Sequence, residues 1–153
     1  MGKVVSINIA EKDGAEIQSI QEVKAHADQG LEGDRYYLKQ GTFSKKDKPD
    51  RQITFIESEA VEAIERDYQV TLDAKEARRN IVTQGIALNH LVGKKFRVGE
   101  AVCEGIKLCE PCGYLQGLVK LNVKDSLIHR GGLRARILES GMIRENDEIQ
   151  ILV

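Results

Sequence analysis

Glycine far outnumbers proline in this chain, and the glycines separate short runs rich in β-branched residues. The sequence has 14 glycines and 2 prolines. Short alternating runs with turn residues between them are typical of a β-rich domain, not of a helical bundle. The runs that alternate in this way are 4–10, 16–25, 51–56, 78–85, 94–108 and 148–153. We therefore expect a mainly β fold.

Some of the connections between these runs can also be predicted from the sequence. Residues 11–15 contain Asp-Gly and predict a hairpin turn. We expect turns or bulges at Val98-Gly99-Glu100, at Glu104-Gly105 and at Ser140-Gly141. Residues 36–52 lack apolar periodicity and predict a mobile surface loop.

One segment has the spacing of an amphipathic helix. Across residues 57–68, apolar side chains recur at helical intervals with charges between them: Ala60, Val61, Ile64 and Tyr68. Residues 113–119 predict a second, shorter helix. No repeat or linker divides the chain, so we expect one domain across residues 1–153.

Length and charge narrow the functional class. The chain has 153 residues, a formal net charge of −1, and neither a Lys/Arg run nor an apolar run long enough for a membrane span. Nucleic acid and membrane are therefore not expected partners. The first ten residues do not resemble a signal peptide, and three cysteines make an odd number, so we expect a cytoplasmic protein with reduced thiols.

Two of the cysteines form the sequence Cys-Glu-Pro-Cys at 109–112. A structural zinc site needs four ligands, and no second half-site has recognisable spacing among the other candidates: Cys103, His26, His90 and His129. Cys103 lies in a strand-like run and is interpreted as a buried cysteine.

Two readings of the cysteine pair remain open. A dithiol oxidoreductase would use Cys109 and Cys112 together, but no proline follows Cys112 to supply the cis-proline of a thioredoxin-like fold. Alternatively, Cys112 is a single reactive thiolate beside the rigid Pro111, able to ligate a soft metal or to accept sulfur.

Arginines recur in loops at the predicted strand ends. Arg35 follows two glycines in GLEGDRYY, and Arg51 precedes a strand. The other polar candidates are Arg79, Asn80, His129, Arg130 and Arg134. Arginine binds phosphate through two parallel hydrogen bonds, so these loops can also form a non-catalytic module that binds a phosphorylated ligand.

Taken in order, these motifs resemble the MOSC family, the domain named after the C-terminal part of molybdenum cofactor sulfurase. The matching pieces are GLEGDRYY, RQITFIESEAVEAI, the segment 78–115, and HRGGLRARILESGMIRENDEI. The resemblance implies a MOSC-like β-barrel with a few short helices that binds molybdenum cofactor (molybdopterin). It also implies a cysteine that ligates molybdenum or carries persulfide sulfur.

Carried over to this sequence, the family cysteine falls on Cys112, with Cys109 as the alternate. The resemblance assigns the cofactor's phosphate and pterin to Arg35, Arg51, Arg79, Asn80, Arg130 and Arg134, and His129 lies beside the last two.

The resemblance also implies partners. This chain is the size of a small standalone bacterial-type member, with no room for a pyridoxal-phosphate desulfurase domain. We therefore expect a separate sulfur donor such as a cysteine desulfurase, or an electron-donor protein, together with molybdenum cofactor biosynthesis proteins. The resemblance leaves open a molybdenum-cofactor-dependent reductase and a sulfurtransferase-type accessory.

Overall fold

The computed structural model describes residues 2–11, 16–34, 37, 52–68, 79–108 and 132–152. Strands dominate these residues, as the sequence predicts. They are β1 (Gly2–Ile9), β2 (Gln18–Ile20), β3 (Glu22–His26), β4 (Gly30–Leu31), β5 (Ile53–Glu57), β6 (Ile81–Gln84), β7 (Lys95–Val98), β8 (Ala101–Leu108), β9 (Leu133–Glu139), β10 (Gly141–Arg144) and β11 (Glu148–Ile151). The helices are α2 (Ser58–Tyr68) and a short 3-10 helix, η1 (Leu88–Leu91).

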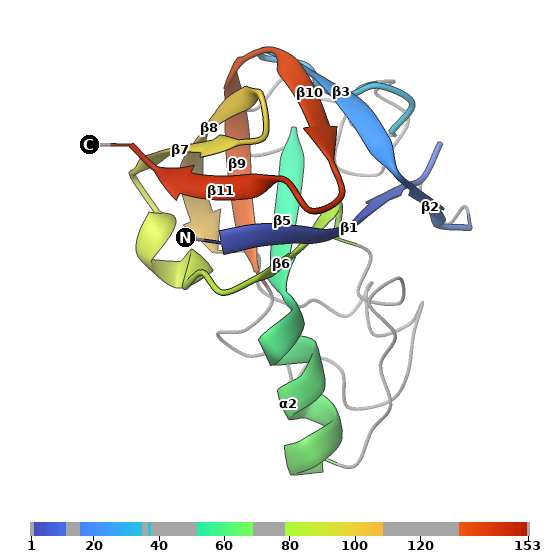
Figure 1. Ribbon diagram of the computed structural model, residues 1–153, viewed down its shortest axis with the longest axis vertical. Helices are drawn as coiled ribbons and strands as arrows, with labels where there is room; N and C mark the ends of the chain where they lie inside the picture. The colour runs from blue at the N-terminus through green and yellow to red at the C-terminus, as the bar shows by residue number, and fades with distance from the viewer. Residues whose placement is uncertain are drawn as a thin grey trace.

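Seven of the strands close into a barrel. Their order is β11-β7-β8-β9-β5-β6-β1, and β1 pairs back onto β11 to complete the ring (Figure 1). Only the β5–β6 pairing is parallel among the described barrel strands. A parallel pair needs a long crossover, and α2 lies in this one, projecting from the end of β5. The expected β-barrel fold with few helices is confirmed.

Apolar side chains fill the interior of the barrel. The rings of Phe55 and Phe96 meet edge to face, with centroids 5.4 Å apart. The residues packed around them are fully buried and include Ile7, Ile53, Ile81, Leu133, Ile137 and Ile149. The interior is therefore a hydrophobic core, so a polar ligand must bind on the outside of the barrel or at one of its ends.

A second, three-stranded sheet, β10-β3-β4, lies against one side of the barrel (Figure 1). The prediction of one strand across 16–25 was wrong, because the chain leaves the first sheet at Gln21 and continues as β3 in the second. The carbonyl oxygen of Gln21 accepts a hydrogen bond of 3.0 Å from the amide of Glu145, which continues the pairing of β3 with β10 by one residue.

Helix α2 begins and ends close to the predicted bounds. Ala60 and Ala63 are its buried small residues, and Glu59 lies in the first turn, where a negative charge favours the helix dipole. None of the helices that the structure describes is long and apolar enough to cross a membrane. The predicted helix at 113–119 and most of the predicted loop at 36–52 lie outside the described residues.

The predicted turns and bulges follow from close backbone packing. Gly99 lies in the β7–β8 turn with φ of 58°. The β8–β9 register shifts between Gly105 and Lys107, which confirms the bulge predicted at Glu104-Gly105. Gly141 begins β10 directly after β9, as expected of a turn at Ser140-Gly141.

Candidate functional site

A row of polar residues crosses the outer face of the barrel where β5, β8 and β9 lie side by side. Thr54 is the register partner of Arg134, and Arg134 is the partner of Lys107. The neighbours of Thr54 and Arg134 along their strands belong to the core, and successive side chains point to opposite faces. Thr54 and Arg134 therefore point away from the barrel interior.

Asn80, directly before β6, extends this row. Its Oδ1 accepts hydrogen bonds from the amide and the hydroxyl of Thr54, at 3.0 and 3.1 Å. Its Nδ2 donates to the carbonyl oxygen of Asn8 at 3.2 Å, and its own carbonyl accepts from the Asn8 amide at 2.7 Å. Asn80 thus joins β1, β5 and β6 beside Thr54, the register partner of Arg134. The preceding residue, Arg79, is buried.

The GLEGDRYY motif packs against this region through its backbone. Gly30 has φ of 138°, and a Cβ there would lie 3.1 Å from the amide nitrogen of Tyr37 and 3.2 Å from the carbonyl oxygen of Gln52. Gly30 therefore allows a close approach to the protein's own chain. Asp34 is fully buried, and its Oδ1 accepts a hydrogen bond of 3.0 Å from the amide of Ala10, at the end of β1.

The turn before this motif is fastened to β9. Asp28 has φ of 59°, its amide donates to the carbonyl of Ile137 at 2.9 Å, and its carboxylate pairs with Nε of Arg136 at 2.6 Å. The hydrogen bond from Arg136 lowers the pKa of Asp28, so the pair stays ionised at neutral pH. Gln52 Oε1 accepts a hydrogen bond from the amide of Ile137 at 2.8 Å, so the residue directly before β5 is also bonded to β9.

Of the predicted site residues, the structure describes Arg79, Asn80 and Arg134, and it brings Asn80 and Arg134 together around Thr54. The remaining ones lie outside the described residues: Arg35, Arg51, Cys109, Cys112, His129 and Arg130. Each has a described neighbour in its own chain segment, and these neighbours are Asp34, Gln52, Leu108 and Gly132.

Of these neighbours, Leu108 and Gly132 lie at the adjoining ends of β8 and β9, whereas Gln52 bonds to Ile137 further along β9 and Asp34 bonds to Ala10 at the end of β1. Leu108 and Leu133 are register partners, so the segment with both cysteines leaves and re-enters the barrel between adjacent strands. Gly132, at the re-entry, has φ of 104°, and a Cβ there would overlap the carbonyl oxygen of Phe55 on β5. Glycine is therefore required at 132 by strand packing.

The third cysteine is structural, as expected. Cys103 is fully buried in the barrel core, and desolvation raises the pKa of its thiol to about 12. No group of three or more His, Cys, Asp or Glu side chains within the described ranges could hold a metal ion.

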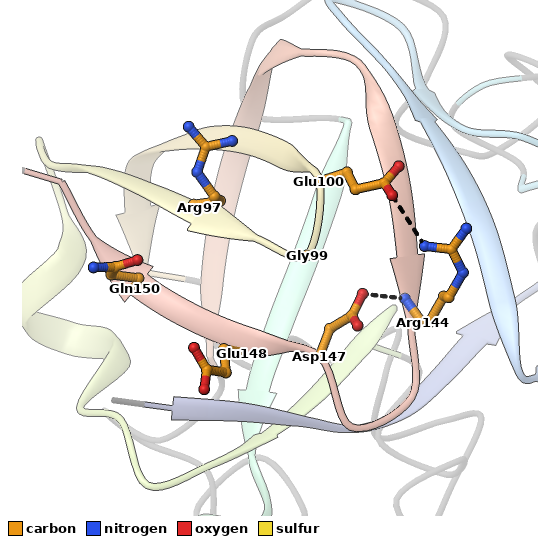
Figure 2. Close-up of a pocket in the computed structure, with 7 residues that line it drawn as sticks. All are labelled: Arg97, Gly99, Glu100, Arg144, Asp147, Glu148 and Gln150. Carbon is orange, nitrogen blue, oxygen red and sulfur yellow. Dashed lines mark hydrogen bonds and ion pairs between the residues drawn. The ribbon is translucent and has the colours of Figure 1, made fainter.

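A shallow depression of about 340 Å³ lies where β10 passes into β11, away from the predicted residues. Arg144 pairs there with Glu100 at 3.2 Å (Figure 2). It also pairs with Glu22 of β3 at 3.3 Å. The amide of Met142 and then Arg144 lower the pKa of Glu100. These residues were not predicted as site residues from the sequence. Polar positions do alternate there with the buried Val98 and Ile149.

The Arg144 network joins the second sheet to the β7–β8 turn, so its charges serve to fasten the two sheets. The residues around the depression are Arg97, Gly99, Glu100, Arg144, Asp147, Glu148 and Gln150. Acidic and basic side chains alternate there, which does not favour a highly charged ligand of either sign.

Comparisons with known proteins place the chain in a family. The model of the MOSC domain matches residues 42–150. Among solved structures, the YUAD protein from Bacillus subtilis has a TM-score of 0.81 at 15% identity, covering 99% of this chain and 96% of its own. YiiM from Geobacillus stearothermophilus has a TM-score of 0.77 at 17% identity, covering 100% of this chain and 76% of its own.

YiiM from Escherichia coli is also similar, with a TM-score of 0.70 at 17% identity, covering 99% of this chain and 70% of its own. At these identities the solved structures show the fold alone. A search of the curated proteins found no match.

Proposed function

Because the chain belongs to the MOSC domain family, which is associated with molybdenum-cofactor proteins, we propose that it binds molybdenum cofactor or a precursor of it. The proposed site is the outer face of β5, β8 and β9, around Arg134. The observation that supports the proposal is the register of these strands, which puts Arg134 on the outer face beside Thr54 and next to the point where the cysteine-bearing segment leaves β8. Thr54 joins Asn80 to Arg134, and Leu108 pairs with Leu133 on either side of the cysteine-bearing segment.

The chemistry of the donors fits the phosphate end of the cofactor. Arg134 is only partly exposed. Arg79, which precedes Asn80 in the sequence, is buried. Guanidinium groups in such positions bind phosphate by charge-assisted hydrogen bonds. Arg35, Arg51, Arg130 and His129 are the further proposed contacts from the adjoining segments.

For the molybdenum end, the ligand that we propose is the thiolate of Cys112, with Cys109 as the alternate. Cys103 is excluded from this role by its burial and its raised pKa. When bound, the cofactor supplies a redox-active molybdenum centre, for which a thiolate is a suitable soft ligand.

The same cysteine suits a role in sulfur delivery. The Cys112 thiolate would attack the terminal sulfur of a persulfide on a separate donor such as a cysteine desulfurase, and the donor cysteine would leave as a thiolate. If the chain instead acts in a reductase, the partner is an electron-donor protein. We place both roles in the cytoplasm, with the proteins of cofactor biosynthesis as the source of the ligand.

The test uses the chain purified from a host that makes molybdenum cofactor. Molybdenum is measured by elemental analysis, pterin by fluorescence after oxidation, and persulfide by intact mass. We expect Cys112→Ser to lose molybdenum or persulfide and to remain folded, whereas Cys109→Ser retains them. Unchanged contents in Cys112→Ser and in the double Ser variant would contradict the proposal.

Two other outcomes would identify the alternatives. A ligand retained by the Cys109/Cys112 double Ser variant but lost in Arg79→Ala indicates a non-catalytic module for a phosphorylated ligand. Reversible formation of a Cys109–Cys112 disulfide at a defined potential indicates a dithiol oxidoreductase.

A further inference from the structure

The turn from η1 into β7 carries positive charge and no carboxylate of its own. Residues 84–99 include His90, Lys94, Lys95 and Arg97 but no Asp or Glu, although 24 of the 153 residues are acidic. His90, Lys94 and Lys95 are exposed. Within the described part of the chain, neither lysine forms an ion pair. This turn therefore presents positive charge to solvent.

Carboxylates of neighbouring strands offset this charge only in part. Glu104 of β8 is the register partner of Lys95, but it also faces Arg136 on β9. Glu57, at the end of β5, accepts a hydrogen bond of 3.4 Å from the amide of Leu88 at the start of η1. One carboxylate is thus shared between two cations and the other is turned toward the η1 backbone, so an excess of positive charge remains.

Two exposed apolar side chains lie in the same place. Val92 directly follows η1 and is 41% exposed, and Ile151, at the end of β11, is 47% exposed. The amide of Leu152 donates to the carbonyl oxygen of Lys95 at 2.9 Å, so the end of β11 lies against the start of β7 (Figure 1). Exposed apolar residues with a polar rim are typical of protein interaction surfaces. The η1 corner is this surface, and it consists of His90, Val92, Lys94, Lys95 and Ile151.

The η1 corner lies beside the strand end from which the cysteine-bearing segment departs. Val92 forms a bridge to Gly105, and the amide of Gly93 donates to the carbonyl oxygen of Gly105 at 2.8 Å. From there β8 continues to Leu108, about 10 Å further along the strand. η1 also packs against β5 and β9, so the corner and the start of the segment after Leu108 share one end of the barrel.

We propose that the η1 corner is the docking surface for an acidic protein that delivers sulfur to Cys112. The inference rests on the proposed function, because it supplies the donor for the same cysteine. Persulfide exchange requires contact between two sulfur atoms, so the donor must dock next to the cysteine-bearing segment. The Cys112 thiolate attacks the terminal sulfur, the S–S bond of the donor persulfide breaks, and the donor cysteine leaves as a thiolate.

The charge of the corner defines the chemistry of this partner. Carboxylates on the donor would meet Lys94 and Lys95, and complementary charge speeds the encounter of two proteins and fixes their orientation. Val92 and Ile151 would then be covered by apolar side chains of the donor at the centre of the contact. A small interface of this kind suits a donor that must leave after each transfer.

The test measures sulfur transfer to the full chain from the cysteine desulfurase of the expression host, charged with radiolabelled cysteine. We expect the Lys94→Glu/Lys95→Glu variant to receive sulfur about tenfold or more slowly at low salt, because its charge repels an acidic donor. The Lys94→Gln/Lys95→Gln variant, which loses the attraction without adding repulsion, should be slower by about threefold or more. Added salt should slow transfer to the unmodified chain and change the Glu variant little.

Two controls separate docking from the chemistry of the cysteine. Lys24→Glu reverses the charge of an exposed lysine on β3 of the second sheet and should receive sulfur at the unmodified rate. Inorganic polysulfide transfers sulfur to a thiolate without a docking surface, so it should load all variants to the same persulfide content by intact mass.

Equal transfer from the desulfurase to the unmodified chain and to the Glu variant would overturn the inference. So would an equal loss with both sulfur sources, since the effect would then lie in the cysteine-bearing segment. A dimer of the unmodified chain that the Glu variant does not form would overturn it in favour of a second copy of the chain. Loading by polysulfide but not by the desulfurase would overturn the docking and leave the proposed function standing. No persulfide from either source would remove the sulfur role from the proposed function and this inference with it.

Discussion

Asn80 and Thr54 bind each other through both backbone and side chain. The Asn80 amide donates to Oγ1 of Thr54 at 2.9 Å, while Oδ1 of Asn80 accepts from the Thr54 hydroxyl and amide. Both residues are almost completely buried. The geometry therefore makes Asn80 a connector between strands, and its predicted contact with the cofactor stays a prediction.

Replacement of Asn80 by Ala should lower the free energy of unfolding by about 2 to 4 kcal/mol, because buried groups of Thr54 and Asn8 lose their partners. Urea denaturation measures the change. Gln150→Ala is the matched control at an exposed amide side chain of β11 and should change stability by less than about 1 kcal/mol. A folded Asn80→Ala protein of unchanged stability would refute the connector role.

Two glycines with positive φ should respond differently to the same substitution. Gly132→Ala adds a Cβ that overlaps the carbonyl of Phe55, whereas Gly93→Ala adds one with no atom within 4 Å. We expect Gly93→Ala to cost about 1 to 2 kcal/mol from backbone strain alone and Gly132→Ala to cost clearly more. Thermal unfolding of both variants tests this, and equal losses would contradict the close packing at Gly132.

The buried thiol of Cys103 should make stability fall at alkaline pH. Its pKa in the folded protein is raised to about 12, so between about pH 9 and pH 12 the unfolded chain loses this proton while the folded one keeps it. The free energy of unfolding should fall by up to about 1.4 kcal/mol per pH unit from this group. We expect Cys103→Ala to lack this part of the slope in urea denaturation, and an identical pH dependence in the two proteins would exclude it.

Much of the fold follows from local patterns in the sequence. The alternation of β7 and β8 around Gly99 predicts the hairpin that the structure contains, and the helical spacing of apolar residues predicts α2. The break at Gln21 could not be predicted, because both sides of it alternate equally well. What separates β2 from β3 is pairing with β1 on one side and with β10 on the other, and these partners are distant in sequence.

The candidate site, like the fold, could be predicted from the sequence only in part. The sequence predicted Arg134 in a loop at a strand end, but it lies within β9, on the outer face beside Thr54. The bonds between Asn80 and Thr54 span 26 residues and cannot be read from either segment. The sequence also does not show that Lys107 faces Arg134, because this register depends on a bulge held by the backbone of Leu91 and Gly93.

The pairing of β1 with β11 places nearly the whole chain between two adjacent strands. Until residues 148–151 are synthesised, Gly2 and Lys3 of β1 lack a partner on one edge, because β2 covers only Ile7 to Ile9 there. The edge of β7 waits for the same strand. Exposed edges invite association between chains, so the nascent protein is most prone to aggregate just before its last strand arrives. Closure of the ring is the step that ends this exposure.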